Sequence, residues 1–286
     1  MTIGVIGGSG IYEALPLEDT RTETVTTPYG DPSDDVTLGE LAGKEVAFLP
    51  RHGEDHQHTP TDAQYRANIY ALKSVGVDRV ISTNAVGSLR EDLPPQTLVV
   101  PDQIFDRTKH RSPTFFGDGI VVHMGFAEPY CPEMVDHLAD AAAAVTDAET
   151  KTERGGTYVC IEGPQYSTRA ESEFYRSQGW DVVGMTTIPE AKLAREAELS
   201  YATVAGITDY DVWKQDNEVT LDEVLENAAA NQDSINAVIE RAIRTMPEDF
   251  ESDAWSALEG TINTPTEAIP DETRERVDLL AGEYLD

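Results

Sequence analysis

Two carboxylates stand two residues apart in Thr208-Asp209-Tyr210-Asp211, directly after the apolar run of residues 201–207. Small and β-branched residues make that run a predicted buried strand, and the carboxyl end of such a strand is where open α/β sheets bind ligands. Alternation along the strand would turn both carboxylates toward one side of the sheet. A carboxylate accepts hydrogen bonds and, once protonated, donates a proton, which suits the amino group and ring nitrogens of adenine. The pair therefore indicates an adenine site, with a cap or loop feature as the plainer alternative.

Four other predicted strands also end in small, polar or basic residues. Together these turns supply backbone N–H groups next to glycine, several hydroxyls, one guanidinium and one imidazole, which suits a tetrahedral oxyanion such as phosphate. The turns are Gly7-Gly8-Ser9-Gly10, Arg51-His52-Gly53, Thr83-Asn84-Ala85-Val86-Gly87-Ser88 and Gly184-Met185-Thr186-Thr187.

The first of these turns, Gly7-Gly8-Ser9-Gly10, matches neither common nucleotide-binding glycine motif. The dinucleotide fingerprint requires Gly or Ala where Glu13 stands, and a P-loop would end in Gly-Lys-Ser/Thr. This spacing excludes an NAD-dependent dehydrogenase. Taken alone, the motif predicts a tight turn.

His52, His56 and His58 are close enough in sequence to raise the question of a metal site. No cysteine accompanies them, and the acids between them are typical of a solvated loop, so we expect no metal. Cys131 and Cys160 are the only cysteines, which gives neither a disulfide framework nor a zinc-binding spacing.

The composition is strongly acidic, with 53 acidic and 21 basic residues among 286 and a net charge of -32. Such a surface repels nucleic acid and anionic lipid, so neither is expected as a partner. A phosphate site in this chain would need local cations, for which Arg51 and His52 are the candidates. The acids are spread along a chain that is 40% hydrophobic. We therefore expect a folded, salt-adapted protein from a haloarchaeal source and not a disordered chain.

The beginning of the chain and its hydropathy bear on localisation. Met1-Thr2-Ile3-Gly4-Val5 enters a predicted strand directly, so we expect no signal peptide. No apolar run approaches membrane-spanning length. A cytoplasmic protein is the expectation.

Strand and helix patterns alternate along the chain. Helical spacing of apolar residues covers residues 62–75, 132–145, 170–179 and 221–243. This alternation predicts a single α/β domain with a central mixed β-sheet flanked by helices, which we place at residues 1–246.

An acidic C-terminal extension, residues 247–286, follows this domain. Residues 246–286 contain 12 acids and 2 bases, and residues 271–285 have the apolar spacing of one amphipathic helix. A partly helical extension is expected, with a solvated, partly ordered tail as the plainer alternative and no role in the site.

The motifs above occur in the order found in the 5′-methylthioadenosine phosphorylases of the trimeric purine nucleoside phosphorylase family. The chain resembles that family from Thr2 to about Met246, and the resemblance implies the nucleoside phosphorylase fold. Further segments that carry it are Thr27-Pro28-Tyr29-Gly30-Asp31-Pro32-Ser33-Asp34, Tyr65-Arg66-Ala67-Asn68-Ile69-Tyr70-Ala71-Leu72-Lys73, Ala127-Glu128-Pro129-Tyr130-Cys131-Pro132, Ile161-Glu162-Gly163-Pro164-Gln165-Tyr166-Ser167 and Thr208-Asp209-Tyr210-Asp211-Val212-Trp213-Lys214.

The resemblance implies a phosphate site in which the Arg51 guanidinium holds two phosphate oxygens. It implies no metal and no cofactor, with inorganic phosphate as a co-substrate. Asn84 departs from the Ser or Thr common in the methylthioadenosine enzymes, and Gly184 departs from the Asn that many of them carry. The implied phosphate ligands are Ser9, Arg51, His52, Asn84, Ala85 and Thr186.

For the nucleoside, the resemblance stacks the base on Tyr166, with Ser167 at the base edge and the ribose against Met185. Asp209 faces the N6/N7 edge, assisted by Asp211. Related enzymes for 6-oxopurines tend to have Asn at the position of Asp209, because an amide donates to O6 and a carboxylate cannot. Asp209 therefore favours adenine. Core packing is the plainer alternative for Met185 and Tyr166.

The 5′ end of the nucleoside is assigned to an apolar helical turn. Leu221, Val224 and Leu225 share one face at i, i+3 and i+4, and ordinary helix core is the alternative. The resemblance further implies that His123 comes from a neighbouring subunit to close the pocket. An obligate oligomer follows, with a trimer expected and a hexamer as a further possibility.

The expected activity is reversible phosphorolysis of 5′-methylthioadenosine, with Asp209 and Asp211 assisting the departing purine. A broader purine nucleoside phosphorylase, acting on adenosine, inosine or guanosine, is the alternative that Asn84 and Gly184 keep open. A non-catalytic nucleoside-binding regulator is a more distant one, because a sensor would need no phosphate ligands beside its nucleoside.

Overall fold

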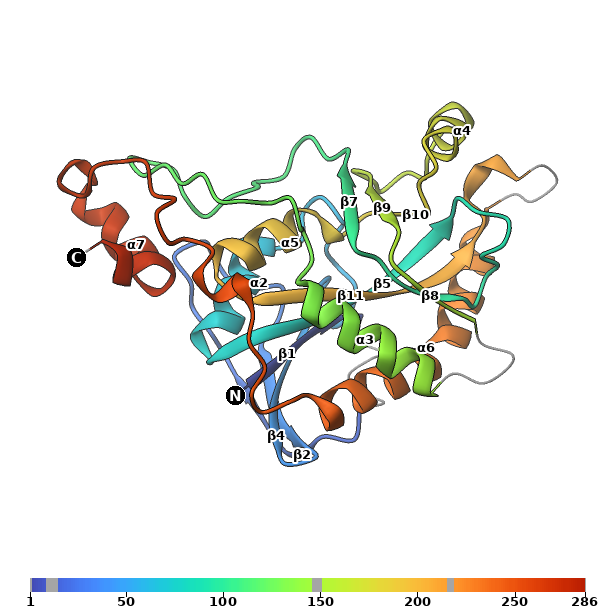
Figure 1. Cartoon of the computed structure of the whole chain (residues 1–286), viewed down its shortest axis with the longest axis horizontal. Coiled ribbons are helices and arrows are strands. Elements are labelled where there is room, and N and C mark those ends of the chain that lie inside the picture. Colours follow the sequence, from blue (N-terminus) through green and yellow to red (C-terminus); the bar gives the residue numbers. More distant parts are fainter. Residues whose placement is uncertain (1, 9–14, 146–150, 215–218, 286) are drawn as a thin grey trace.

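The computed structural model describes residues 2–8, 15–145, 151–214 and 219–285. It confirms an α/β domain on a central mixed sheet, with helices on both faces (Figure 1). No helix within these residues is long and apolar enough to cross a membrane.

The sheet has 11 strands among the described residues. Eight of them follow the order β2-β3-β4-β1-β5-β10-β9-β7; of the other three, β11 pairs with both β5 and β6, and β8 pairs with β6. The strands are β1 Thr2–Gly7, β2 Glu18–Glu23, β3 Val36–Leu41, β4 Lys44–Pro50, β5 Val77–Ser88, β6 Leu98–Val100, β7 Gln103–Asp106, β8 Thr152–Arg154, β9 Thr157–Cys160, β10 Val182–Gly184 and β11 Ser200–Asp209.

Strand β5 brings the predicted strand ends together. It runs parallel to β1 and β11, and its last residues pair antiparallel with β10. Gly87 of β5 is therefore opposite both Val183 of β10 and Asp209 of β11. On the other side, β1 pairs parallel with β4, so Arg51 follows Pro50 next to the end of β1. Parallel strands thus deliver their polar turns to one edge of the sheet.

The helices cover the two faces of the sheet in pairs, α2 and α5 on one face and α3 and α6 on the other (Figure 1). With α4, which belongs to neither pair, the bounds of the helices are α2 Tyr65–Ser74, α3 Pro132–Val145, α4 Arg169–Ser177, α5 Thr187–Glu196 and α6 Leu221–Thr245. Four of them confirm the predicted helices at 62–75, 132–145, 170–179 and 221–243. Helix α5 was not predicted, since its first residues were interpreted only as a polar turn.

The sequence explains where two of these helices begin. Thr168 caps α4 and forms a capping box with Glu171, and Thr220 caps α6 by accepting a hydrogen bond from the Glu223 N–H. Such caps satisfy N–H groups that the first turn leaves free.

The acidic extension runs from the end of α6 across the domain, and its last part lies at the end of the molecule far from α4 (Figure 1). Its helix α7, Asp271–Ala281, is followed by the 3-10 turn η4, Gly282–Tyr284, so the α-helix is shorter than residues 271–285. The extension and the loop before α3 form a second apolar cluster, comprising Phe116, Ile120, Leu258, Ile269, Val277, Ala281 and Leu285. Residues 247–285 are therefore a packed part of the structure and not a solvated tail.

Candidate active site

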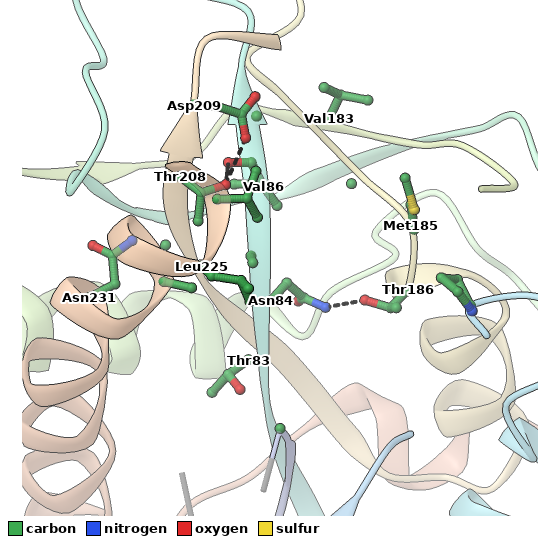
Figure 2. Close-up of a pocket in the computed structure, with 18 of the residues that line it drawn as sticks. Thr83, Asn84, Val86, Val183, Met185, Thr186, Thr208, Asp209, Leu225 and Asn231 are labelled. Carbon is green, nitrogen blue, oxygen red and sulfur yellow. Dashed lines mark hydrogen bonds between the residues drawn. The ribbon is translucent and has the colours of Figure 1, made fainter. Parts of the chain in front are cut away.

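A cavity of about 580 Å³ opens where β5, β10 and β11 end, and α6 forms one of its walls. Figure 2 shows that side chains from these strands and from α6 converge on it. Of the predicted site residues, those that line it are Arg51, His52, Asn84, Ala85, Tyr166, Ser167, Met185, Thr186, Asp209, Asp211, Leu221, Val224 and Leu225.

The two carboxylates reach the cavity by different routes. Asp209 is the last residue of β11, whereas Asp211 begins the 3-10 turn η1, Asp211–Trp213, with a φ of 51°. The Asp211 N–H donates to Asp209 Oδ1 at 2.7 Å, and Thr208 Oγ1 donates to Asp209 Oδ2 at 2.7 Å. Simple strand alternation was therefore the wrong reason for their shared location, because a turn of the backbone brings Asp211 back toward Asp209.

A glycine makes room for this pair on the neighbouring strand. A Cβ atom at Gly87 would lie 2.9 Å from Asp209 Oδ1 and 3.3 Å from the Asp211 Cβ. Any side chain at position 87 would push the carboxylates away from β5.

Both carboxyl groups are almost completely buried. Burial raises the pKa of Asp209, and burial together with the Asp209 charge raises the pKa of Asp211. A proton is therefore retained at this end of the cavity to a higher pH than in water, as proton donation to a leaving purine requires.

At the other end of the cavity, an amide orients a hydroxyl. Asn84 Nδ2 donates to Thr186 Oγ1 at 2.5 Å (Figure 2), and Asn84 Oδ1 accepts from the Thr203 hydroxyl. Because Thr186 Oγ1 accepts from Asn84, its own hydrogen is the donor that this hydroxyl can offer to another group. Asn84 thus has a defined structural role at the position where the resemblance implies Ser or Thr.

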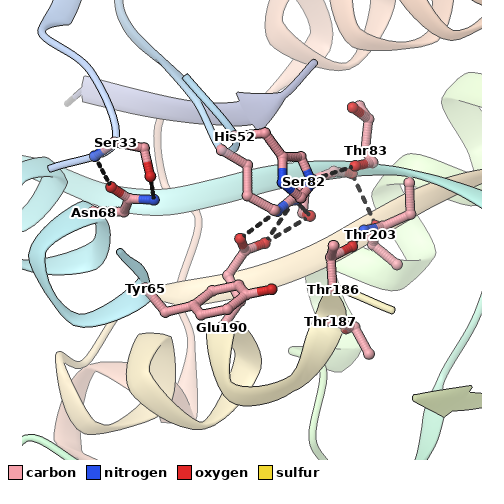
Figure 3. A network of polar contacts seen from close by, with 12 residues as sticks. Ser33, His52, Tyr65, Asn68, Ser82, Thr83, Thr186, Thr187, Glu190 and Thr203 are labelled. Carbon is pink, nitrogen blue, oxygen red and sulfur yellow. Dashed lines mark hydrogen bonds and ion pairs between the residues drawn. The ribbon is translucent and has the colours of Figure 1, made fainter. Parts of the chain in front are cut away.

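Arg51 is buried and held by an acid that the sequence analysis did not assign. Its Nε and Nη2 atoms donate to the Glu190 carboxylate at 2.7 and 2.9 Å, and Nη2 also donates to Ser82 Oγ. Figure 3 shows the two partners, Glu190 and Ser82, side by side in this buried polar network. The bidentate face of the guanidinium is therefore turned to Glu190, and not to the open cavity as the expected grip on two phosphate oxygens requires.

His52 is neutral in this setting. Burial and the neighbouring Arg51 charge lower its pKa to about 3. Its Nδ1 donates to the His58 carbonyl at 2.9 Å, and its ring stacks on His56 with centroids 4.4 Å apart. Of the two local cations expected, His52 is therefore neutral, and the charge of Arg51, which lines the cavity, is paired with Glu190.

The apolar wall comes from the first turns of α6. Leu221 and Leu225 are 62% and 58% exposed, and with Val224 they line the cavity. Ordinary helix core would be buried, so that interpretation is excluded for the two leucines.

Gly184 leaves space that another side chain occupies. A Cβ atom at this position would lie 2.0 Å from the Tyr158 hydroxyl. Tyr158 thus takes the space that an Asn side chain at position 184 would need, which gives the departure at Gly184 a steric reason.

Two predicted site residues remain. Ser9 falls outside the described residues. His123 is exposed, donates its N–H to the Thr261 carbonyl at 2.9 Å, and does not line the cavity of its own chain.

Sequence reasoning missed Glu190, Arg111 and Glu162, which lie behind the cavity wall. Glu190 pairs with Arg51 across 139 residues, and Arg111 contacts backbone up to 77 residues away. A local motif does not contain such partners. A signal was available only for Glu190, since an acid in an otherwise apolar helix face needs a buried partner.

Comparisons with known proteins agree with this geometry. The sequence profile of the phosphorylase superfamily matches residues 2–244. The chain belongs to the phosphorylase superfamily. Among curated members, the S-methyl-5′-thioadenosine phosphorylases of Koribacter versatilis and Geobacter sulfurreducens are 50% and 48% identical. The alignments cover 99% of this chain and 96% and 99% of those proteins, so they include the acidic extension.

Solved superfamily structures are also similar. A methylthioadenosine phosphorylase from an Antarctic soil metagenomic library has a TM-score of 0.93 at 49% identity, covering 97% of this chain and 98% of that one. The methylthioadenosine phosphorylase of Schistosoma mansoni in complex with adenine has a TM-score of 0.79 at 38% identity, covering 85% and 91%. The nucleoside phosphorylase fold expected from the sequence is therefore confirmed.

Proposed function

We propose that this superfamily member catalyses the reversible phosphorolysis of S-methyl-5′-thioadenosine to adenine and 5-methylthioribose 1-phosphate. The observation that carries the proposal is one continuous cavity with paired carboxylates at one end, oriented neutral donors at the other and an apolar helical turn as a wall. Each part matches one part of the reacting pair: base, phosphate and 5′-methylthio group.

In this reaction, phosphate attacks C1′ of the ribose as the glycosidic bond breaks, and positive charge develops on the sugar. Asp209 and Asp211 assist the departing adenine by hydrogen bonding or protonation at N7. The phosphate anion, next to Thr186, Asn84 and the Ala85 N–H, offsets the charge on the sugar. Positioning and electrostatics supply the rate enhancement, and no covalent intermediate is required.

Two features support methylthioadenosine as the substrate over adenosine, inosine and guanosine. In its ionised form Asp209 accepts from the N6 amino group of adenine and has no hydrogen to donate to the O6 atom of inosine or guanosine. Leu221 and Leu225 present exposed apolar surface to the cavity, and that surface suits a methylthio group better than a 5′-hydroxyl. The names of the relatives favour the same substrate.

We further propose a homotrimer in which His123 of one subunit closes the cavity of another. The surface location of His123, outside the cavity of its own chain, supports this arrangement. Light scattering measures the molar mass of the assembly. His123→Ala should weaken nucleoside binding and leave that molar mass unchanged. A stable, fully active monomer would contradict the proposal.

Salt adaptation is a separate proposal, motivated by the net charge of -32. Screening of self-repulsion should raise the melting temperature between low and molar KCl. A melting temperature that is equal or lower in molar KCl would contradict it.

The substrate assignment is tested by kcat/KM for adenine or hypoxanthine release from methylthioadenosine, adenosine and inosine at saturating phosphate and high salt. The proposal predicts that methylthioadenosine is the best substrate and inosine the poorest. A preference for inosine would replace the proposal with the general purine nucleoside phosphorylase.

A further inference from the structure

A buried arginine behind the cavity wall contacts two separate backbone segments. Arg111 lies in the long connection between β7 and α3, and only 1% of its side chain is exposed. Nη1 donates to the Met185 carbonyl at 2.5 Å and to the Ile188 carbonyl. Nη2 donates to the Glu162 carbonyl at 2.5 Å and approaches that of Ile161 at 3.4 Å. Arg111 does not line the cavity itself.

Both segments form walls of the cavity. The segment with Ile161 and Glu162 leads into Tyr166 and Ser167, and the other segment contains Met185 and Thr186. They also touch each other directly at Gly163, where φ is +67° and a Cβ atom would lie 2.5 Å from Met185 Sδ. A change in either segment would therefore be transmitted to the other.

The Glu162 carboxylate extends this arrangement to a third wall. Oε1 accepts from Arg111 Nε and from the Thr61 hydroxyl, both at 3.1 Å. Oε2 accepts from the N–H groups of Lys109 and His110, which precede Arg111. Thr61 follows Pro60, which lines the cavity. Burial acts to raise the pKa of Glu162, but these N–H groups and the Arg111 charge outweigh it and lower the pKa, so Glu162 remains a carboxylate.

We propose that Arg111, anchored by Glu162, is a positioning residue that fixes the base wall and the phosphate–ribose wall relative to each other. The inference rests on the proposed function, because that function gives the walls their roles. An arginine is needed since its planar guanidinium has five donors in fixed directions, and a lysine has three donors on one atom. No single ammonium group can reach carbonyls on both segments and the Glu162 carboxylate together.

The test compares Arg111→Lys with a matched variant, Arg79→Lys. Arg79 is equally buried, with 3% of its side chain exposed, pairs with Asp78 and stacks on Phe250 and Trp255 away from the cavity. Hydrogen–deuterium exchange of the substrate-free protein is followed in peptides covering residues 161–167 and 185–190. Kinetic constants for methylthioadenosine and phosphate are measured in parallel.

Arg111→Lys should speed exchange in both segments by about tenfold or more, the scale expected for lost hydrogen bonds to a charged group. It should also raise KM for both substrates, while Arg79→Lys changes neither. If Arg111→Lys does not fold, Glu162→Gln replaces it, because the amide nitrogen cannot accept from the Lys109 and His110 N–H groups. The same pair of segments should then loosen.

Exchange that rises in one segment alone, in neither, or equally in Arg79→Lys would overturn the proposal. Exchange is measured without substrate, so it does not depend on activity. Faster exchange of both segments in Arg111→Lys, with a wild-type protein that is inactive on methylthioadenosine, would contradict the proposed function and leave the role of Arg111 intact. Unchanged exchange in Arg111→Lys, with a wild-type enzyme that is fully active on methylthioadenosine, would overturn the role of Arg111 and leave the proposed function intact.

Discussion

The polar floor of the cavity and its α6 wall differ in how they are held. On the floor, Asn84, Thr186 and Asp209 are buried and hydrogen-bonded to neighbouring residues. On the wall, Leu221 and Leu225 are more than half exposed. The floor is therefore organised before any ligand binds, whereas the two leucines of the wall leave apolar surface open to a ligand.

Helix α6 is nevertheless fixed to the floor a little further along the chain. Asn227 and Asn231, four residues apart, donate to the Thr208 and Ile207 carbonyls at 2.8 and 2.9 Å. Gly206 permits this contact, since a Cβ atom there would lie 2.8 Å from Asn231 Nδ2. Substitutions on the floor should therefore weaken catalysis or phosphate binding, whereas substitutions on the wall should change only the preference between nucleosides.

The largest effect is expected at the carboxylate end. Asp209→Asn should reduce kcat/KM for methylthioadenosine about 10²- to 10⁴-fold, the usual contribution of a positioned proton donor. It should shift preference from 6-amino toward 6-oxo nucleosides, because an amide can donate to O6. The measurement is kcat/KM for methylthioadenosine and inosine. A variant that keeps its full preference for adenine would remove Asp209 from reading the base.

At the opposite end of the floor, Thr186→Val should raise KM for phosphate about tenfold, as expected for one hydrogen bond to a charged group. KM for methylthioadenosine should change little. Thr187→Val is the matched control, because the Thr187 hydroxyl is also buried but pairs with Tyr130 at 2.9 Å, outside the cavity. Equal effects of the two variants would mean that Thr186 acts through packing alone.

A smaller effect is expected on the wall. Burial of a methylthio group should favour methylthioadenosine over adenosine by about 1–3 kcal/mol, and Leu221→Ser should erode that preference with little change for adenosine. Leu279→Ser, on exposed α7 surface, is the control. The ratio of the two kcat/KM values is the measurement, and an unchanged ratio would show that this turn does not read the 5′ group.

The smallest expected effect is on stability, and it depends on pH. The raised pKa of Asp209 means that the folded state binds its proton more tightly than the unfolded state, so this group's contribution to stability falls as pH rises through the folded pKa. Asp209→Asn should therefore have a larger free energy of unfolding than wild type at pH 8, and the difference between the two proteins should be smaller at pH 4. Denaturant unfolding at both pH values decides it. A gap that widens toward pH 4 would mean that the carboxylate stabilises the fold.

Much of the floor could be predicted because it is local in sequence. Each polar turn follows its own strand, and the parallel pairing of β1, β4, β5 and β11 brings these turns to one edge. The path of Asp211 could not be predicted, since it depends on a positive φ and on the Asp209 carboxylate accepting its N–H.

The residues that support the site are set by long-range contacts. Glu190 meets Arg51, and Arg111 meets Glu162, only because the sheet and the connection before α3 fold them together. The packed state of the extension was also not readable from an acidic sequence. It depends on apolar partners such as Phe116 and Ile120 in a distant loop, and on Asp118, which pairs with Arg276.

The central claim is that one cavity binds phosphate and nucleoside together and exchanges the glycosidic bond for a sugar–phosphate bond. Phosphorus NMR of the protein with methylthioadenosine and inorganic phosphate measures this directly. Phosphorolysis predicts a new sugar 1-phosphate signal that grows in a 1:1 ratio with free adenine, and no adenine without phosphate. Adenine released without phosphate, or with no new phosphorus signal, would show hydrolysis and contradict the account.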